Sequence, residues 1–162
     1  MTKPTVGIIG LGAMGAGIAK TLRNNGFTIH VCDVRPGVAD AFVADGGTAH
    51  ATTAALAAVS DVVVSVVVNA AQTGSVLFGD DGKGGAASAM RPGSTFVMCS
   101  TVDPNWSVAL EARLAELGLL YIDAPISGGA ARAANGEMTM MTAGRPEAYA
   151  RAEPLLHAMA AK

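Results

Sequence analysis

The segment TVGIIGLGAMG, residues 5–15, joins an apolar run to three glycines spaced Gly-x-Gly-x-x-Gly. Residues 5–9 have the β-branched, apolar composition of a buried strand, which the glycines terminate. Beyond them, Met14, Ile18 and Leu22 recur at the spacing of one helix face. The segment therefore predicts a strand, a glycine turn and a helix, in the order that opens a βαβ unit.

Strand-like and helix-like segments alternate along the rest of the chain, with no linker and no repeat of fixed period. This alternation is typical of a mainly parallel sheet with helices on both faces. We therefore expect one doubly wound α/β domain of the Rossmann type over residues 1–162. The expected strands are residues 5–9, 27–32, 48–51, 62–68, 95–99, 119–122 and 138–143, and the expected helices are residues 13–25, 38–45, 53–59, 70–77, 104–117 and 146–160.

Composition excludes several classes of protein. Of the 162 residues 51% are hydrophobic and 15% are charged, with a formal net charge of −2, which excludes a disordered acidic or basic chain. The longest apolar run, residues 62–68, is far shorter than the ~20 residues that span a bilayer. Aromatic residues make up 4% of the chain, and this scarcity argues, with the slightly negative charge, against a nucleic-acid partner.

The cysteines and histidines form no metal-binding or disulfide pattern. Cys32 and Cys99 lie far apart without a Cys-x-x-Cys spacing, and the three histidines share no ligand interval. Each cysteine is expected to be a small apolar strand residue. The first residues run directly into a strand without the apolar region of a signal peptide, so the reducing cytoplasm is the expected compartment.

The three glycines of the turn suit the binding of a dinucleotide pyrophosphate. Gly10 permits the tight turn, Gly12 lets the backbone approach the phosphates, and Gly15 allows close packing of helix and strand. The first amides of the helix would donate to the phosphate oxygens. Chance is a competing explanation in a chain with 20 glycines, but the motif stands between a predicted strand and a predicted helix, as this function requires.

An acidic residue stands where a dinucleotide site needs one. Asp33 directly follows the second predicted strand and stands 33 − 15 = 18 residues after Gly15. Its carboxylate can accept hydrogen bonds from the adenosine ribose hydroxyls and would repel a 2′-phosphate, which favours NAD over NADP. Arg35 complicates this preference, since it could pair with a 2′-phosphate, and Val34 lies between the two. A plain turn with a surface acid and a solvated arginine is the alternative interpretation.

Further polar residues follow other predicted strands, at the edge where doubly wound sheets bind ligands. Ser100-Thr101 follows the strand at 95–99 and could serve only to start the next helix. Ser127, Gly128 and Gly129 follow the strand at 119–122 and offer a hydroxyl and two unobstructed amides, which suit a carboxylate; a simple glycine turn is the alternative.

Residues 10–15, Cys99-Ser100-Thr101 and the stretch Asp-Ala-Pro-Ile-Ser-Gly-Gly at 123–129 occur in the order seen in the 3-hydroxyisobutyrate, or β-hydroxyacid, dehydrogenases. The chain resembles this family over nearly its whole length. Residues 66–72 (VVVNAAQ) and 133–141 (AANGEMTMM) are more particularly similar to the L-threonate dehydrogenases within it. Most other members carry Leu-Pro where Val67-Val68 stands.

The resemblance implies a role for each matching position. Residues 10–15 would hold the pyrophosphate of NAD, and residues 33–35 would meet the adenosine ribose. Residues 127–129 would bind the carboxylate of a small hydroxy acid. The implied cofactor-binding residues are Gly10, Leu11, Gly12, Ala13, Met14, Gly15, Asp33, Val34, Arg35, Val67, Val68, Gln72 and Thr101, the last beside the nicotinamide, and the implied substrate-binding residues are Ser127, Gly128 and Gly129.

One feature of the family is missing. Its general acid/base is a lysine on a helix after the Rossmann domain, but the four lysines here match other positions: Lys3 before the first strand, Lys20 within the first helix, Lys83 in an expected mobile loop, and Lys162 before the family's final strand. We therefore expect the catalytic lysine, and the helical C-terminal domain through which the family forms homo-oligomers, to lie beyond Lys162.

The resemblance implies the NAD-binding domain of a dehydrogenase that oxidises a small sugar acid, most nearly L-threonate. Other substrates stay open, namely 3-hydroxyisobutyrate, tartronate semialdehyde or a similar hydroxy acid. A non-catalytic NAD-binding module is a second alternative. An S-adenosylmethionine-binding domain would share the glycine turn and the acidic residue that binds the ribose, but this interpretation leaves residues 127–129 without a role.

Overall fold

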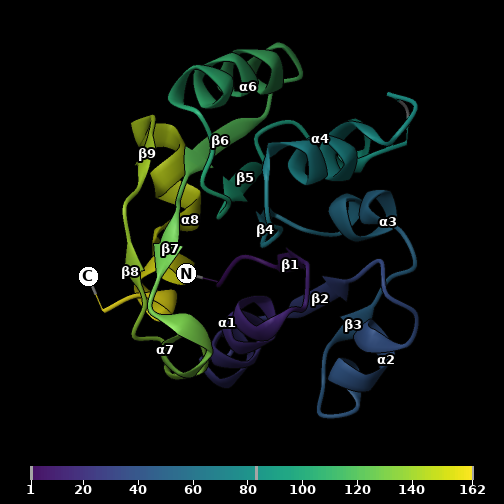
Figure 1. Ribbon diagram of the computed structural model, residues 1–162, viewed down its shortest axis with the longest axis vertical. Helices are drawn as coiled ribbons and strands as arrows, with labels where there is room; N and C mark the ends of the chain where they lie inside the picture. The colour runs from purple at the N-terminus through teal and green to yellow at the C-terminus, as the bar shows by residue number, and fades with distance from the viewer. Residues whose placement is uncertain (1, 83, 162) are drawn as a thin grey trace.

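A computed structural model describes residues 2–82 and 84–161. It contains a seven-stranded sheet in the order β3-β2-β1-β4-β5-β6-β9, parallel except for β9 at the edge, and a separate antiparallel pair, β7-β8 (Figure 1). The strands are β1 Val6–Ile9, β2 Ile29–Cys32, β3 Thr48–Ala49, β4 Val62–Ser65, β5 Thr95–Met98, β6 Leu120–Asp123, β7 Ile126–Ser127, β8 Thr139–Met140 and β9 Ala143–Gly144, and the helices are α1 Ala13–Asn24, α2 Val38–Val43, α3 Thr53–Ala58, α4 Ala70–Phe78, α5 Ala86–Ala89, α6 Pro104–Glu116, α7 Gly129–Asn135 and α8 Pro146–Met159.

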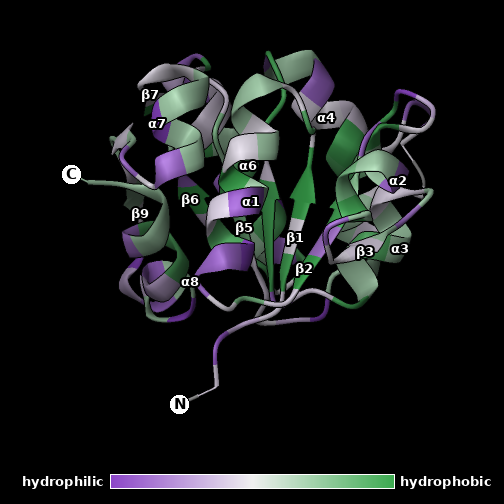
Figure 2. Ribbon diagram, turned by 90° about the horizontal axis from the view of Figure 1, so that it is seen from below, coloured by the Kyte–Doolittle hydropathy of each residue, from purple (hydrophilic) through white to green (hydrophobic). Residues whose placement is uncertain are grey.

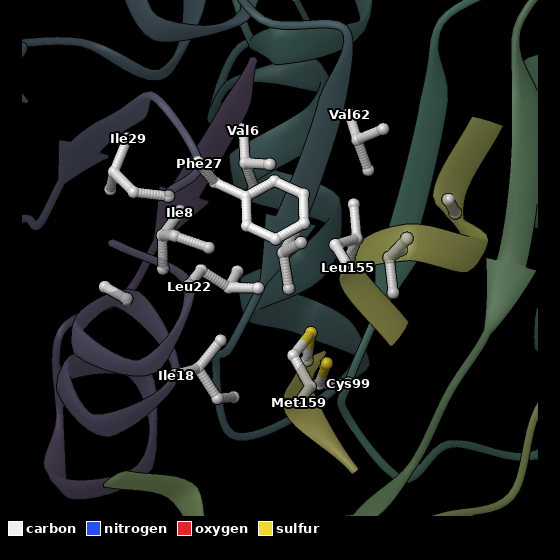
Figure 3. Close-up of a cluster of buried hydrophobic side chains, with 14 of the residues drawn as sticks. Val6, Ile8, Ile18, Leu22, Phe27, Ile29, Val62, Cys99, Leu155 and Met159 are labelled. Atoms are coloured by element: carbon white, nitrogen blue, oxygen red, sulfur yellow. The ribbon is translucent and has the colours of Figure 1, made fainter. Parts of the chain in front are cut away.

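Helices cover both faces of the sheet, so the expected doubly wound α/β fold is confirmed. Alternate strand residues point to opposite faces and divide the core into two clusters. One cluster joins the sheet to α1, α2, α7 and α8, and Figure 3 shows it around Ile8, Leu22, Phe27 and Leu155. The other joins the opposite face to α3, α4, α5 and α6 around Phe96. Figure 2 shows the apolar strands enclosed between these layers.

Local sequence signals explain where several helices begin. Asp103 accepts hydrogen bonds from the amides of Asn105 and Trp106, and Pro104 occupies the first position of α6. Thr52 caps α3 by accepting a hydrogen bond from the amide of Ala55. These side chains satisfy amides that the first turn of a helix otherwise leaves without partners.

The chain between β6 and α8 differs from the expected pattern. The single strand expected over 138–143 is wrong, because residues 139–140 pair with β7 while residues 143–144 pair antiparallel with β6. Helix α7 and the short α5 were not expected either. Alternating apolar residues identify an extended segment but not its partner, and four to seven residues rich in alanine and glycine carry little helical periodicity.

Candidate functional site

The predicted site residues gather at the carboxyl edge of the sheet, where the strand order reverses between β1 and β4. From β1 the chain proceeds outward to β2 and β3, and from β4 it proceeds in the other direction to β5 and β6. The loops after β1 and β4 therefore diverge, and ligands of open α/β sheets bind in the crevice that results. The segment before β1 lies at the opposite edge (Figure 2).

Two glycines of the turn after β1 are required by their surroundings. Gly10 has a φ of +94°, and a Cβ atom there would lie 2.3 Å from the carbonyl oxygen of Val66. A Cβ atom on Gly15 would lie 1.9 Å from the carbonyl oxygen of Gly10. Both distances are far below van der Waals contact, so a side chain at either position would force the loop open.

The middle glycine is different, because, its two chain neighbours aside, no atom of the described residues lies within 4 Å of the place where its Cβ would stand. Gly12 is exposed at the start of α1, and no side chain caps the first turn of that helix. In contrast, α3, α4 and α6 are capped by Thr52, Asn69 and Asp103. The open space and the uncapped amides together form the surroundings that an anion needs at a helix start.

The other motif residues contribute in different ways. The side chain of Leu11 is buried, and its amide donates to Oδ2 of Asp33 at 2.7 Å, which ties the glycine turn to the end of β2. Ala13 is exposed beside Gly12, whereas Met14 packs against the core. Of the three, Ala13 alone combines an exposed position with the first turn of α1.

Both carboxylate oxygens of Asp33 accept hydrogen bonds. Oδ1 accepts from the amide of Arg35 at 2.9 Å and from its Nε at 3.0 Å, and Oδ2 accepts from Nη2 of Arg35 at 3.0 Å. The hydrogen bonds and charge of the Arg35 side chain, together with the amides of Arg35 and Leu11, lower the pKa of Asp33 to about 2, although burial acts in the opposite direction. Val34 is 94% exposed. A hollow of about 420 Å³ opens beside these residues and is bounded on its far side by residues 49–51.

The loop after β4 is held by a chain of hydrogen bonds. The amide of Val68 donates to Oε1 of Gln72 at 2.8 Å, and the amide of Gln72 donates to Oδ1 of Asn69 at 2.9 Å. Ser100 Oγ donates to the carbonyl oxygen of Val67 at 2.7 Å. Gln72 thus accepts from an amide that a proline at position 68 would lack. The exposed Val68 side chain and the exposed Thr101 lie at this same edge.

Ser127, Gly128 and Gly129 connect β7 to α7. Ser127 is exposed, and the φ angles of Gly128 and Gly129 are +137° and +75°, so this path needs both glycines. A Cβ atom on Gly128 would lie 2.8 Å from Cδ of Arg132, which means that the stem of this arginine lies over the motif. Among the described residues Arg132 has no carboxylate partner. The sequence signal that could have placed Arg132 at this motif is its four-residue spacing from Gly128, which is recognisable only once α7 is known to be a helix.

A second unpredicted contact joins the two motifs. A Cβ atom on Gly17 of α1 would lie 2.8 Å from the amide nitrogen of Ala134 and 2.9 Å from Cβ of Ala133, both in α7. Thr21 Oγ1 donates to the carbonyl oxygen of Ala134 at 2.6 Å. The helix that follows the glycine turn is therefore packed directly on the helix that follows the Ser127 motif (Figure 1).

The described lysines lie away from this edge. Lys3 donates to the carbonyl oxygen of Asn25, and Lys20 is exposed on α1. Lys83, with the expectation of a mobile loop around it, and Lys162 fall outside the described residues. Asp123 faces Ser107 and Tyr121 on the α6 side, where burial raises its pKa. The described residues contain no group of His, Cys, Asp and Glu suited to a metal, and no helix among them could cross a membrane.

Comparisons with known proteins agree with this geometry. Residues 5–162 match the family described as the NAD binding domain of 6-phosphogluconate dehydrogenase. The chain is 54% identical to an L-threonate dehydrogenase of Cupriavidus necator over 97% of its own length and 52% of that protein's. It therefore spans about half the length of the curated relatives it matches.

Solved structures give the same result. A crystal structure of 3-hydroxyisobutyrate dehydrogenase from Salmonella typhimurium superposes with a TM-score of 0.91 at 40% identity, over 98% of this chain and 54% of that one. A structure of Psf3 in complex with NADP+ superposes with a TM-score of 0.90 at 30% identity, over 98% and 55%. The resemblance to the 3-hydroxyisobutyrate dehydrogenases is confirmed, and the chain belongs to the family of NAD-binding domains described for 6-phosphogluconate dehydrogenase.

Proposed function

We propose that this chain binds NAD within a dehydrogenase that oxidises a hydroxyl group of a small sugar acid, most nearly L-threonate. The observation that carries the proposal is the glycine turn: an open position at Gly12, uncapped first-turn amides of α1, and an acid at the end of β2. The 54% identity to an L-threonate dehydrogenase supports the substrate, and the 3-hydroxyisobutyrate dehydrogenase at 40% supports the wider class of hydroxy acids.

The cofactor half of the site follows from the residues at the carboxyl edge. The amides of residues 12–14 donate to the pyrophosphate, and Asp33 accepts from the adenosine ribose. Val67 and Val68 form an apolar wall for the middle of the cofactor, and Thr101 stands beside the nicotinamide. Gln72 acts through the Val68 amide. NAD, when bound, supplies the acceptor for the hydride.

The substrate half uses residues 127–129. The Ser127 hydroxyl and the amides of Gly128 and Gly129 donate to the substrate carboxylate, and the guanidinium of Arg132 adds a positive charge beside them. These contacts orient the hydroxylated carbon. The proton of its hydroxyl is taken by the family's lysine, which we place, with the helical domain and the homo-oligomer contacts, in sequence beyond residue 162. The twofold longer relatives support this division.

The compartment we propose is the cytoplasm. Cys32 and Cys99 are free thiols buried in the core, which is the state that a reducing compartment preserves.

The test compares two lengths of the protein. Fluorescence titration of the 162-residue chain is expected to show saturable NADH binding, tighter than that of NADPH. In an NADH absorbance assay the same chain is expected to give no turnover of L-threonate, because proton removal needs a base within about 3 Å of the hydroxyl. A chain extended by the C-terminal half is expected to turn over. No NADH binding would refute the cofactor assignment, and turnover by the short chain would refute the placement of the base.

A further inference from the structure

The hydrogen bonds to the Asp33 carboxylate leave it no free acceptor position for the hydroxyls of the adenosine ribose. A carboxylate offers about four acceptor positions in its plane. Oδ1 of Asp33 accepts from the amide and Nε of Arg35, and Oδ2 accepts from the amide of Leu11 and from Nη2 of Arg35. All four are occupied, so a ribose hydroxyl can donate to this carboxylate only if one of the present donors leaves.

The four donors are not equally movable. Two are backbone amides, of Leu11 in the glycine turn and of Arg35 in the loop after β2, and both are fixed by the fold around them. The other two belong to the Arg35 guanidinium. The side chain of Arg35 is 57% exposed, whereas that of Asp33 is 5% exposed. The acid is therefore held in place, and the arginine is the group that can turn away into solvent.

We propose that the Arg35 side chain is a displaceable cap on the ribose-recognition acid, and that it sets both the affinity for NAD and the discrimination against NADP. This inference rests on the proposed function. In the free chain the guanidinium occupies the two acceptor positions that a ribose diol needs. Binding of NADH must break these two bonds, so the affinity is lower than that of the same site without the cap.

The displaced guanidinium acts in the opposite sense on NADPH. A 2′-phosphate cannot donate to Asp33 and is repelled by it, but it can accept from an arginine at the same loop. The cap thus weakens NADH binding and strengthens NADPH binding. A residue with a merely structural role would change both affinities in the same direction, so opposite signs identify the cap.

The experiment is a fluorescence titration of NADH and NADPH against the unmodified chain and Arg35→Ala. Loss of an exposed ion pair changes an equilibrium constant by roughly 1.4- to fivefold, so we expect the Kd of NADH to fall by about this factor and the Kd of NADPH to rise by at least as much. Lys20→Gln removes an exposed charge from α1 and is the matched control, expected to leave the ratio of the two Kd values unchanged.

A double-mutant cycle separates the cap from general electrostatics. In the Asp33→Asn background no carboxylate remains to be freed, so Arg35→Ala should no longer tighten NADH binding. Persistence of the gain in that background, or affinities for both cofactors that move together, would overturn the inference while leaving the proposed function intact. Failure of the unmodified chain to bind either cofactor would overturn both.

Discussion

Substitution of the middle glycine is expected to separate cofactor binding from folding. A Cβ atom at Gly12 would meet no atom of the described residues within 4 Å apart from its chain neighbours, and the φ of −66° and ψ of −170° suit any L-residue. Gly12→Val should therefore cost only the difference in N-cap preference between glycine and valine, about 0.5–1 kcal/mol. For a domain of this size that lowers the Tm by about 1–4 °C.

The effect on NADH binding should be far larger. The valine would fill the open space in which the pyrophosphate meets the first amides of α1. Hydrogen bonds to charged groups contribute about 1.5–3 kcal/mol each, so loss of two corresponds to about 3–6 kcal/mol, or at least ~100-fold in Kd. Calorimetric titration with NADH, together with a thermal unfolding scan, measures both quantities on one sample.

Two other glycines provide the controls. Gly15→Ala would bring its Cβ to 1.9 Å from the Gly10 carbonyl oxygen, so stability and binding should fall together. Gly74, inside α4, has nothing within 4 Å of its Cβ position, so Gly74→Ala should raise stability by about 0.5–1 kcal/mol and leave the NADH affinity unchanged. A folded Gly12→Val variant that retained the original NADH affinity would refute the assignment of this turn to the phosphates.

Two further predictions concern stability. Since the pKa of Asp33 is lowered from 3.8 to about 2, its ionised form stabilises the fold fully above about pH 4, and this stabilisation is lost as the pH falls toward 2. Thermal unfolding scans of Asp33→Asn across this pH range should lack that loss of stability. An identical pH profile for the two proteins would contradict the ion pair. Gly17→Ala would place a Cβ 2.8 Å from the amide nitrogen of Ala134, so urea unfolding should show a loss of about 1–3 kcal/mol, and an unchanged midpoint would contradict the close packing of α1 on α7.

The parts of the fold predicted correctly from the sequence are those with a local cause. Residues 5–9 and 13–25 carry strand composition and helical spacing, and Asp103-Pro104 is a start signal for a helix; each lies within one or two residues of the observed element. The region from 124 to 144 was less predictable, because its neighbouring short strands β8 and β9 pair in different sheets. Pairing of a two-residue strand is decided by the surrounding fold rather than by the residues themselves.

The candidate site shows the same division. The glycine motif and Asp33 were recognisable from residue types and spacing. The capping of Asp33 by Arg35 was not, since the sequence shows only that the two stand two residues apart. Gln72 is predicted to lie near the cofactor, and the structure adds that its side chain accepts a hydrogen bond from the Val68 amide. In both residues the side-chain direction decides the role, and no local pattern specifies that direction.

The contact between α1 and α7 gives the domain a means of fixing the two halves of the proposed reaction relative to each other. The first turn of α1 faces the proposed phosphate position, and about one turn further along Gly17 packs against Ala133 of α7, which begins at the Ser127 motif. A larger residue at position 17 would push α7 outward and carry residues 127–129 with it. Hydride transfer needs the reacting carbons about 3–3.5 Å apart, so a displacement of 1 Å is costly. A glycine here is therefore explained by the distance between cofactor and substrate as well as by packing.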